Sequence, residues 1–102
     1  MTEVYIGLGS NLNQPVHQLD QAIHSLRQLP KTTVEAVSPY YQSKPMAGMD
    51  QPDYVNAVVR LDTGLAPMVL LRQLQGIERR QGRPEMHEHW SARILDLDLL
   101  LY

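Results

Sequence analysis

Two aspartates near the end of the chain are the residues whose types and spacing first suggest chemistry. Asp96 and Asp98 interrupt an apolar run of strand-forming residues, "ARILDLDLLLY", at residues 92–102. Residues at positions i and i+2 of a strand project from the same face, about 7 Å apart. Such a carboxylate pair could hold cations that prefer oxygen ligands, such as Mg²⁺, against a polyphosphate.

The ordinary alternative is an antiparallel strand that shows polar side chains to solvent and apolar ones to the core. Two features of the run weaken this alternative. Aspartate is disfavoured in strands, and like charges on one face repel unless a cation or a cationic side chain lies between them. Asp96 and Asp98 are therefore candidate metal ligands.

Four arginines bracket the loop that precedes this pair. Arg79, Arg80, Arg83 and Arg93 carry guanidinium groups that can bind two phosphate oxygens at once. Arginine at a helix end is also commonly a solvated residue that complements the helix dipole. Trp90, in the same loop, could stack on a flat heterocycle or anchor the loop. For the arginines alone the solvated role is favoured, whereas for Trp90 neither role is preferred.

Two other motifs carry less weight. The run "EMHEH" at residues 85–89 lacks a fixed third ligand at a recognisable spacing, so a solvated loop is favoured over a metal site. The run "GLGSN" at residues 7–11 lacks the third glycine of a dinucleotide fingerprint, and no parallel βαβ sheet follows it. A Rossmann fold is therefore not expected.

Hydrophobic periodicity indicates which elements position these residues. Period-2 alternation and β-branched runs predict strands at residues 3–10, 32–38, 54–62 and 93–102. Helical spacing, with a proline in each first turn, predicts helices at 15–30 and 66–82, and Gly82 is expected at a left-handed stop. Residues 39–52 contain three prolines and no sustained periodicity, so we expect a functional loop there.

The order βαββαβ predicts an α+β fold of ferredoxin-like type, with a four-stranded antiparallel sheet and both helices on one face. We expect residues 1–102 to form a single domain. Leu95, Leu97, Leu99 and Leu101 should face the helices. In this topology the first strand lies between the third and fourth. The open face should then gather two bare glycines and four polar or aromatic residues, namely Gly7, Gly9, Tyr54, Asn56, Asp96 and Asp98.

Composition limits the class of protein. The chain has 102 residues, a formal net charge of −2 and no cysteine, which excludes a disulfide scaffold and a catalytic thiol and suits the cytoplasm. No apolar run approaches the roughly 18 residues that span a membrane. Without a basic block, binding to nucleic acid through phosphate neutralisation is not expected.

Three stretches together resemble one enzyme family. "YIGLGSNL" (residues 5–12), "DQPDYVNAVV" (50–59) and "GR…W…RILDLDLLLY" (82–102) are similar, in this order, to 6-hydroxymethyl-7,8-dihydropterin pyrophosphokinase of folate biosynthesis. The resemblance implies a ferredoxin-like fold that transfers pyrophosphate from ATP to the hydroxymethyl group of the pterin, with two Mg²⁺ ions.

The resemblance also implies roles for individual residues. Asp96 and Asp98 would bind Mg²⁺, and Arg83, Trp90 and Arg93 would belong to a catalytic loop that closes over the phosphates. The pterin would be bound by Ser43, Lys44, Pro45, Met46, Tyr54, Asn56 and Trp90. The nucleotide would be bound by Gln75, Glu78, Arg83, Arg93 and Leu99. In polyphosphate transfer a protein mainly positions reactants and neutralises charge, which suits this set.

The chain departs from the family pattern at Glu85, where an arginine is usual, and at Ser91–Ala92, where Gly-Pro is usual. Family members also run further past the last strand, so we expect a short or C-terminally truncated member. The alternatives are a degenerate member that binds pterin or nucleotide without turnover and a small ferredoxin-like interaction module. Uncovered apolar residues on the open face lead us to expect a homodimer through that face or the sheet edge.

Overall fold

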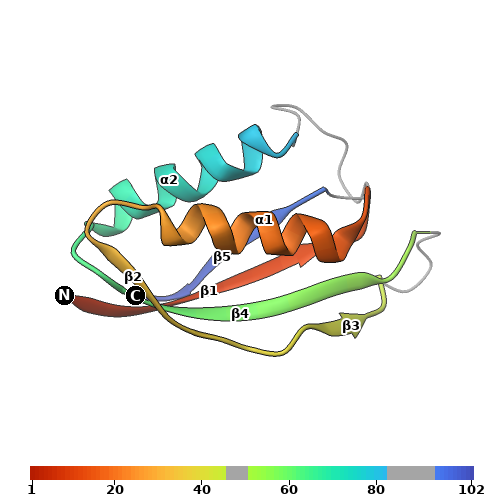
Figure 1. Cartoon of the computed structure of the whole chain (residues 1–102), viewed down its shortest axis with the longest axis horizontal. Helices are drawn as coiled ribbons and strands as arrows, with labels where there is room; N and C mark the ends of the chain where they lie inside the picture. Colours follow the sequence, from red (N-terminus) through yellow and green to blue (C-terminus); the bar gives the residue numbers. More distant parts are fainter. Residues whose placement is uncertain (46–50, 83–93) are drawn as a thin grey trace.

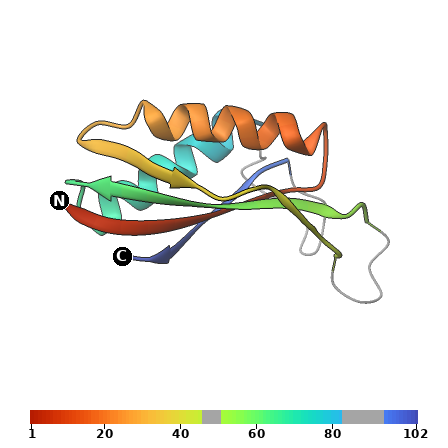
Figure 2. The same cartoon turned by 60° about the horizontal axis from the view of Figure 1, so that its bottom comes forward.

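A computed structural model of the chain describes residues 1–45, 51–82 and 94–102. Two layers are visible in Figure 1, a twisted sheet and a pair of helices that both cover the same side of it. Figure 2, turned by 60°, shows the same separation, with the strands lying beneath α1 (Pro15–Arg27) and α2 (Pro67–Arg80). The opposite face of the sheet has no described helix over it. The α+β architecture predicted from the sequence is confirmed.

The sheet is antiparallel, and its order has the ferredoxin-like form expected. Strands β2 (Thr32–Val37), β4 (Tyr54–Thr63), β1 (Thr2–Ser10) and β5 (Asp96–Leu101) lie side by side in that order. β1 therefore lies between β4, which carries Asn56, and β5, which carries Asp96 and Asp98. Within the described part of the chain, β2 and β5 end the main path of the sheet.

A fifth strand corrects the expectation of an irregular loop at residues 39–52. β3 (Tyr41–Ser43) pairs antiparallel with β4, and Tyr41 lies opposite Asn56. β4 is ten residues long, so β2 covers one half of its edge and β3 covers the other. Ser38 joins the two halves, because its backbone amide donates to the Val58 carbonyl (2.9 Å) and its hydroxyl accepts from the Val58 amide (2.9 Å).

Both helices begin at a proline and end before the expected stops, Pro30 and Gly82. The first ends at Arg27, and the second ends at Arg80. Gly82 has a φ of 105°, the left-handed conformation expected after the second helix. The core lies between the helices and the sheet, and its fully buried large side chains include Ile6, Leu19, Leu26, Leu61, Leu70, Leu74, Ile77 and Leu95.

The last strand begins at Asp96, three residues later than predicted, and it contains an irregularity. Ile6 pairs with Leu99 whereas Tyr5 pairs with Leu101, so Leu100 is an extra residue in β5. Such a bulge reverses the alternation of faces beyond it. Leu95 and Leu97 are buried as expected. Leu101, expected to face the helices, is instead 61% exposed.

In the residues that the structure describes, neither helix combines the length and the apolar composition that crossing a membrane requires.

Candidate active site

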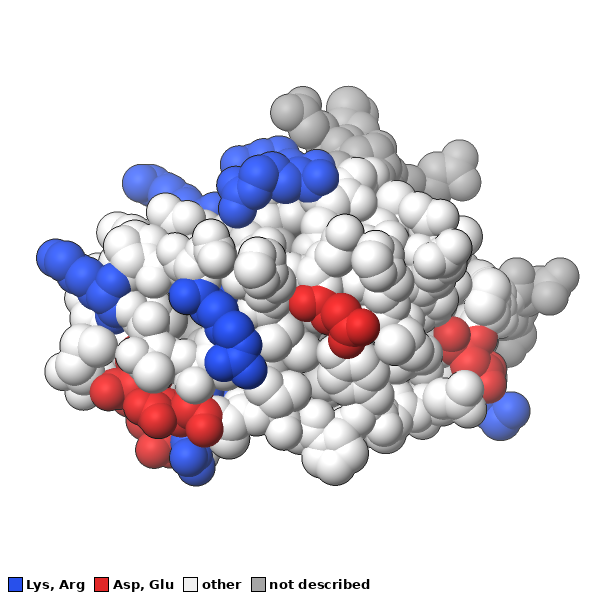
Figure 3. All heavy atoms as spheres, in the orientation of Figure 1, with Lys and Arg blue, Asp and Glu red and all other residues white. Residues whose placement is uncertain are grey.

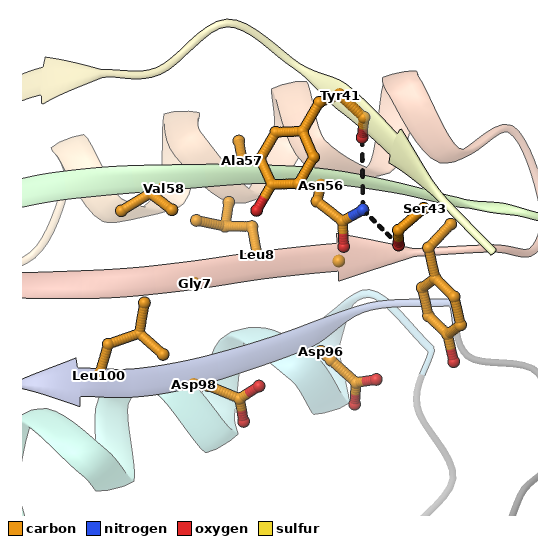
Figure 4. A pocket seen from close by; sticks show the side chains of 12 residues that line it. Gly7, Leu8, Tyr41, Ser43, Asn56, Ala57, Val58, Asp96, Asp98 and Leu100 are labelled. Carbon is orange, nitrogen blue, oxygen red and sulfur yellow. Dashed lines mark hydrogen bonds between the residues drawn. The ribbon is translucent and has the colours of Figure 1, made fainter. Parts of the chain in front are cut away.

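The open face of the sheet contains a pocket of about 350 Å³. It is lined from β1, β3, β4 and β5 and includes the six residues that the sequence places on this face: Gly7, Gly9, Tyr54, Asn56, Asp96 and Asp98. Tyr41 and Ser43 of β3, Val58 of β4 and Leu100 of β5 also contribute to its lining. Figure 4 shows β1 crossing the floor, the acidic side chains on one side and Asn56 on the other.

Strand register explains why these residues meet. Gly9 of β1 lies opposite Asn56 of β4 on one side and opposite Asp96 of β5 on the other. Tyr41 of β3 extends the same row beyond Asn56. Because adjacent strands lie about 4.8 Å apart, the backbones at Asp96 and Asn56 are separated by roughly 10 Å. The intervening position has no side chain, so a flat ligand has room between the acid and the amide.

The two carboxylates point to the same side of β5 (Figure 4). Asp96 is half-buried and Asp98 is exposed, and their partners on β1 are Gly9 and Gly7. Among the described residues no group of three or more His, Cys, Asp and Glu side chains could enclose a metal ion. Mg²⁺ commonly takes one or two carboxylates and completes its coordination with water and substrate phosphates. A pair of aspartates beside an open pocket fits that ion.

Asn56 is fixed on the opposite wall by the strand that the sequence did not reveal. Its Nδ2 donates hydrogen bonds to the Ser43 Oγ (2.8 Å) and to the Tyr41 carbonyl (3.3 Å), drawn as dashed lines in Figure 4. These bonds orient the side-chain oxygen towards β1, where a Cβ added at Gly9 would lie 3.3 Å from Asn56 Oδ1. The glycine therefore leaves the amide oxygen accessible to a ligand that offers N–H groups.

The other residues expected around a pterin lie near Asn56 or outside the described chain. Tyr54 is half-buried and pairs with Ser43, and both line the pocket. Lys44 is exposed and Pro45 is half-buried, directly after β3. Met46 lies outside the described residues.

The residues expected at a nucleotide are more dispersed. Gln75 is exposed on α2, and Leu99 is partly buried against the core from β5. Glu78 is buried, with 8% of its surface exposed, and its Oε2 accepts a hydrogen bond from the Leu97 amide at 2.8 Å. These three residues do not line the pocket that contains the aspartates.

The loop that was expected to close over phosphates lies at residues 83–93, outside the described residues. It contains Arg83, Trp90 and Arg93, the departures at Glu85 and Ser91–Ala92, and the histidines of residues 85–89. On the helix that leads to this loop, Arg79 and Arg80 occupy the last turn. Figure 3 shows basic side chains gathered over α2.

Asn11 is a polar residue that the sequence patterns did not single out. It is 1% exposed, and its Nδ2 donates to the Pro52 carbonyl at 3.1 Å. This bond ties the end of β1 to the segment that leads into β4, and so it fixes the end of the sheet where Gly9 and Asn56 lie. In the sequence Asn11 is only a polar residue directly after a strand, and nothing in the pattern indicates that its side chain is buried.

One side chain outside the pocket has a strongly shifted pKa. Partial burial and a 2.6 Å hydrogen bond from its hydroxyl to Asp20 raise the pKa of Tyr40 to about 12. This bond joins the segment before β3 to α1. Because Tyr40 stays protonated at neutral pH, it acts there as a hydrogen-bond donor.

The family model and three similar proteins carry the name of one enzyme family. The family model of 7,8-dihydro-6-hydroxymethylpterin-pyrophosphokinase (HPPK) matches residues 5–102. The chain is 51% identical over 102 residues to a 2-amino-4-hydroxy-6-hydroxymethyldihydropteridine pyrophosphokinase from Haemophilus influenzae, covering all of this chain and 63% of that protein. It is 50% identical to the protein of the same name from Pseudomonas aeruginosa, covering 97% of this chain and 60% of the relative.

A third protein of that name, from Pseudomonas putida, is 48% identical over 96% of this chain and 80% of its own length. The chain thus spans 60 to 63% of the length of the first two relatives. The family match begins within β1 and covers all the later described strands and helices, and it includes the row of residues across the open face. The chain belongs to the 7,8-dihydro-6-hydroxymethylpterin-pyrophosphokinase family.

Proposed function

We propose that the protein transfers pyrophosphate from ATP to 6-hydroxymethyl-7,8-dihydropterin, in the cytoplasm and as a step of folate biosynthesis. The row Asp96–Gly9–Asn56 across three neighbouring strands carries this proposal. An acidic side chain and an amide thereby lie on either side of a position without a side chain, which suits metal-bound phosphates beside a heterocycle. Relatives named for this reaction, at about half identity, support the same activity.

The pterin binds at Asn56 in this proposal. Asn56 Oδ1 accepts hydrogen bonds from the pterin's N–H groups, and Tyr54 and Ser43 line the same wall of the pocket. Lys44, Pro45 and Met46 follow Ser43 along the chain and form the flanking segment. The ring thereby presents its hydroxymethyl oxygen towards the side of the pocket that holds the acidic pair.

Asp96 and Asp98 hold Mg²⁺, and we propose two ions from the family resemblance. Bound Mg²⁺ supplies charge neutralisation for the polyphosphate. The carboxylates fix the triphosphate beside the pterin hydroxyl, and Arg83 and Arg93 bind phosphate oxygens as bidentate donors. Gln75 and Leu99 contact the nucleotide, and Trp90 covers the pterin. The pterin hydroxyl oxygen attacks the β-phosphorus and releases its proton to solvent. The bond from that phosphorus to the α,β-bridging oxygen breaks, and AMP leaves with that oxygen.

The test combines binding and turnover on the same sample. Calorimetry with 6-hydroxymethylpterin, a non-hydrolysable ATP analogue and Mg²⁺ should give saturable binding of both ligands. An assay with ATP and the dihydropterin should give AMP in proportion to enzyme. Binding of both ligands without AMP would identify the catalytically degenerate alternative. Absence of pterin binding at millimolar concentration would contradict the proposal altogether.

Self-association is a further expectation, through the open face or the edge at the end of β5. Leu100, Leu101 and Tyr102 are 56%, 61% and 40% exposed there, and exposed apolar residues at a sheet edge favour association. We expect sedimentation to show a concentration-dependent dimer and Leu101→Lys to shift it towards monomer. Val16→Lys, on α1 and 52% exposed, is the matched control and should leave the dimer intact. A monomer at every concentration tested would contradict this expectation.

A further inference from the structure

Glu78 lies where the packing pattern of α2 calls for an apolar residue. Leu70, Leu74 and Glu78 are spaced four residues apart along one face of the helix, and Ile77 lies beside them. All four are buried, and Glu78 is only 8% exposed. A buried carboxylate is unfavourable unless it receives hydrogen bonds. A hydrogen-bond partner of Glu78 in the described part of the chain indicates what this side chain does.

That partner is the backbone between the two aspartates. The Leu97 amide donates to Glu78 Oε2 at 2.8 Å, and Leu97 is flanked by Asp96 and Asp98. In the described part of the chain, β5 has one neighbouring strand, β1, on which Leu8 lies opposite Leu97. The carboxylate thus serves as a hydrogen-bond acceptor on the side of β5 where no described strand supplies one.

Leu97 is consequently held from three directions. Its side chain is buried in the core, with 5% exposed. Its backbone lies beside β1 on one side, and its amide is bound by Glu78 on the other. A residue fixed in this way sets the direction of both neighbouring side chains, because residues on either side of it in a strand project to the opposite face.

We propose that Glu78 is a positioning residue whose hydrogen bond to the Leu97 amide holds Asp96 and Asp98 side by side on the open face. This inference rests on the proposed function, in which those two carboxylates bind the metal. It differs from the role that the family resemblance implied for Glu78, contact with the nucleotide. Residues that orient metal ligands commonly change metal affinity by 10- to 100-fold when they are replaced.

Two substitutions separate the hydrogen bond from the other properties of the side chain. Glu78→Leu removes the acceptor and completes the apolar face of α2 with Leu70 and Leu74. Glu78→Gln removes the charge and keeps an oxygen that can accept from Leu97. The matched control is Thr63→Val, because the Thr63 hydroxyl also accepts from a buried backbone amide, that of Leu65 at 3.1 Å. Thr63 lies at the other end of β4 from Asn56.

The first readout is Mn²⁺ affinity of the protein without nucleotide, measured by electron paramagnetic resonance. We expect Glu78→Leu to weaken binding about 10-fold or more and Glu78→Gln to stay within about threefold of the wild type. Thr63→Val should leave the affinity unchanged. Wild-type affinity in Glu78→Leu, an equal loss in Glu78→Gln, or an equal loss in Thr63→Val would each overturn the proposal.

The second readout does not depend on metal binding. Amide hydrogen exchange at Leu97 should be at least about tenfold faster in Glu78→Leu than in the wild type, because a partner of that amide is lost. Exchange at Leu65 should stay unchanged in the same variant. If the wild type binds no Mn²⁺, the proposed function fails, and exchange at Leu97 alone decides whether Glu78 holds the strand. Unchanged exchange at Leu97 would overturn the inference.

Discussion

Replacing Asp98 by asparagine is expected to lower the rate of AMP formation by about 10³-fold, which corresponds to roughly 4 kcal/mol of lost transition-state stabilisation. Asparagine keeps the size of the side chain and removes the charge that would hold a divalent cation against the triphosphate. Asp96→Asn should have an effect of similar size, because both carboxylates point to the same side of β5. Steady-state AMP release, together with Mn²⁺ titration, measures the loss.

The control for these variants is Asp62→Asn. Asp62 lies near the other end of β4, opposite Glu3, and does not line the pocket. Its replacement removes the same charge from the sheet, and we expect AMP formation within about twofold of the wild type. Urea unfolding should show that Asp98→Asn is at least as stable as the wild type, since one of two like charges is gone. Full activity in both Asp96→Asn and Asp98→Asn would contradict the metal site.

The second large effect is expected at Asn56. Asn56→Ala removes the amide that we propose binds the pterin, and it also removes the bonds to Tyr41 and Ser43 that hold β3 against β4. We expect pterin affinity to fall about 100-fold, because a ligand group buried without its hydrogen-bond partner loses roughly 1–3 kcal/mol and the pocket wall loosens in addition. Titration calorimetry with 6-hydroxymethylpterin measures the change.

Two further variants separate these contributions. Gly9→Ala keeps the side chain of Asn56 and its partners on β3 but adds a methyl group 3.3 Å from Asn56 Oδ1, so it should weaken pterin binding about tenfold while β3 stays paired. Gln42→Ala, on the exposed surface of β3 and outside the pocket lining, is the control and should bind as the wild type does. Wild-type pterin affinity in Asn56→Ala would contradict the proposal that the Asn56 amide binds the pterin.

The sequence predicted the open face well where strands are long and regular. β1 and β4 are nine and ten residues long and pair without interruption. The rule that residues i and i+2 share a face therefore holds along both strands. It correctly predicted that Gly7, Gly9, Tyr54 and Asn56 lie on the same face, where all four line one pocket. The same rule correctly placed Asp96 and Asp98 beside them.

Prediction failed where local pattern does not determine structure. β3 has three residues, too few to show a period, and it forms because β4 extends past the end of β2 and offers an unpaired edge. The extra residue at Leu100 turns Leu101 away from the helices. In the sequence the alternation of Leu and Asp ends at Leu99, and the uniformly apolar residues that follow do not indicate which of them is the extra one. Glu78 left one local signal, a carboxylate four residues after the buried Leu74, but its partner lies on a strand nineteen residues away.

The most direct test is a crystal structure with Mn²⁺, a non-hydrolysable ATP analogue and 6-hydroxymethylpterin. We expect anomalous Mn²⁺ density at the carboxylates of Asp96 and Asp98, with the pterin hydrogen-bonded to Asn56 across Gly9 and the phosphates between them. Mn²⁺ bound elsewhere, or a pterin outside the pocket on the open face, would contradict it.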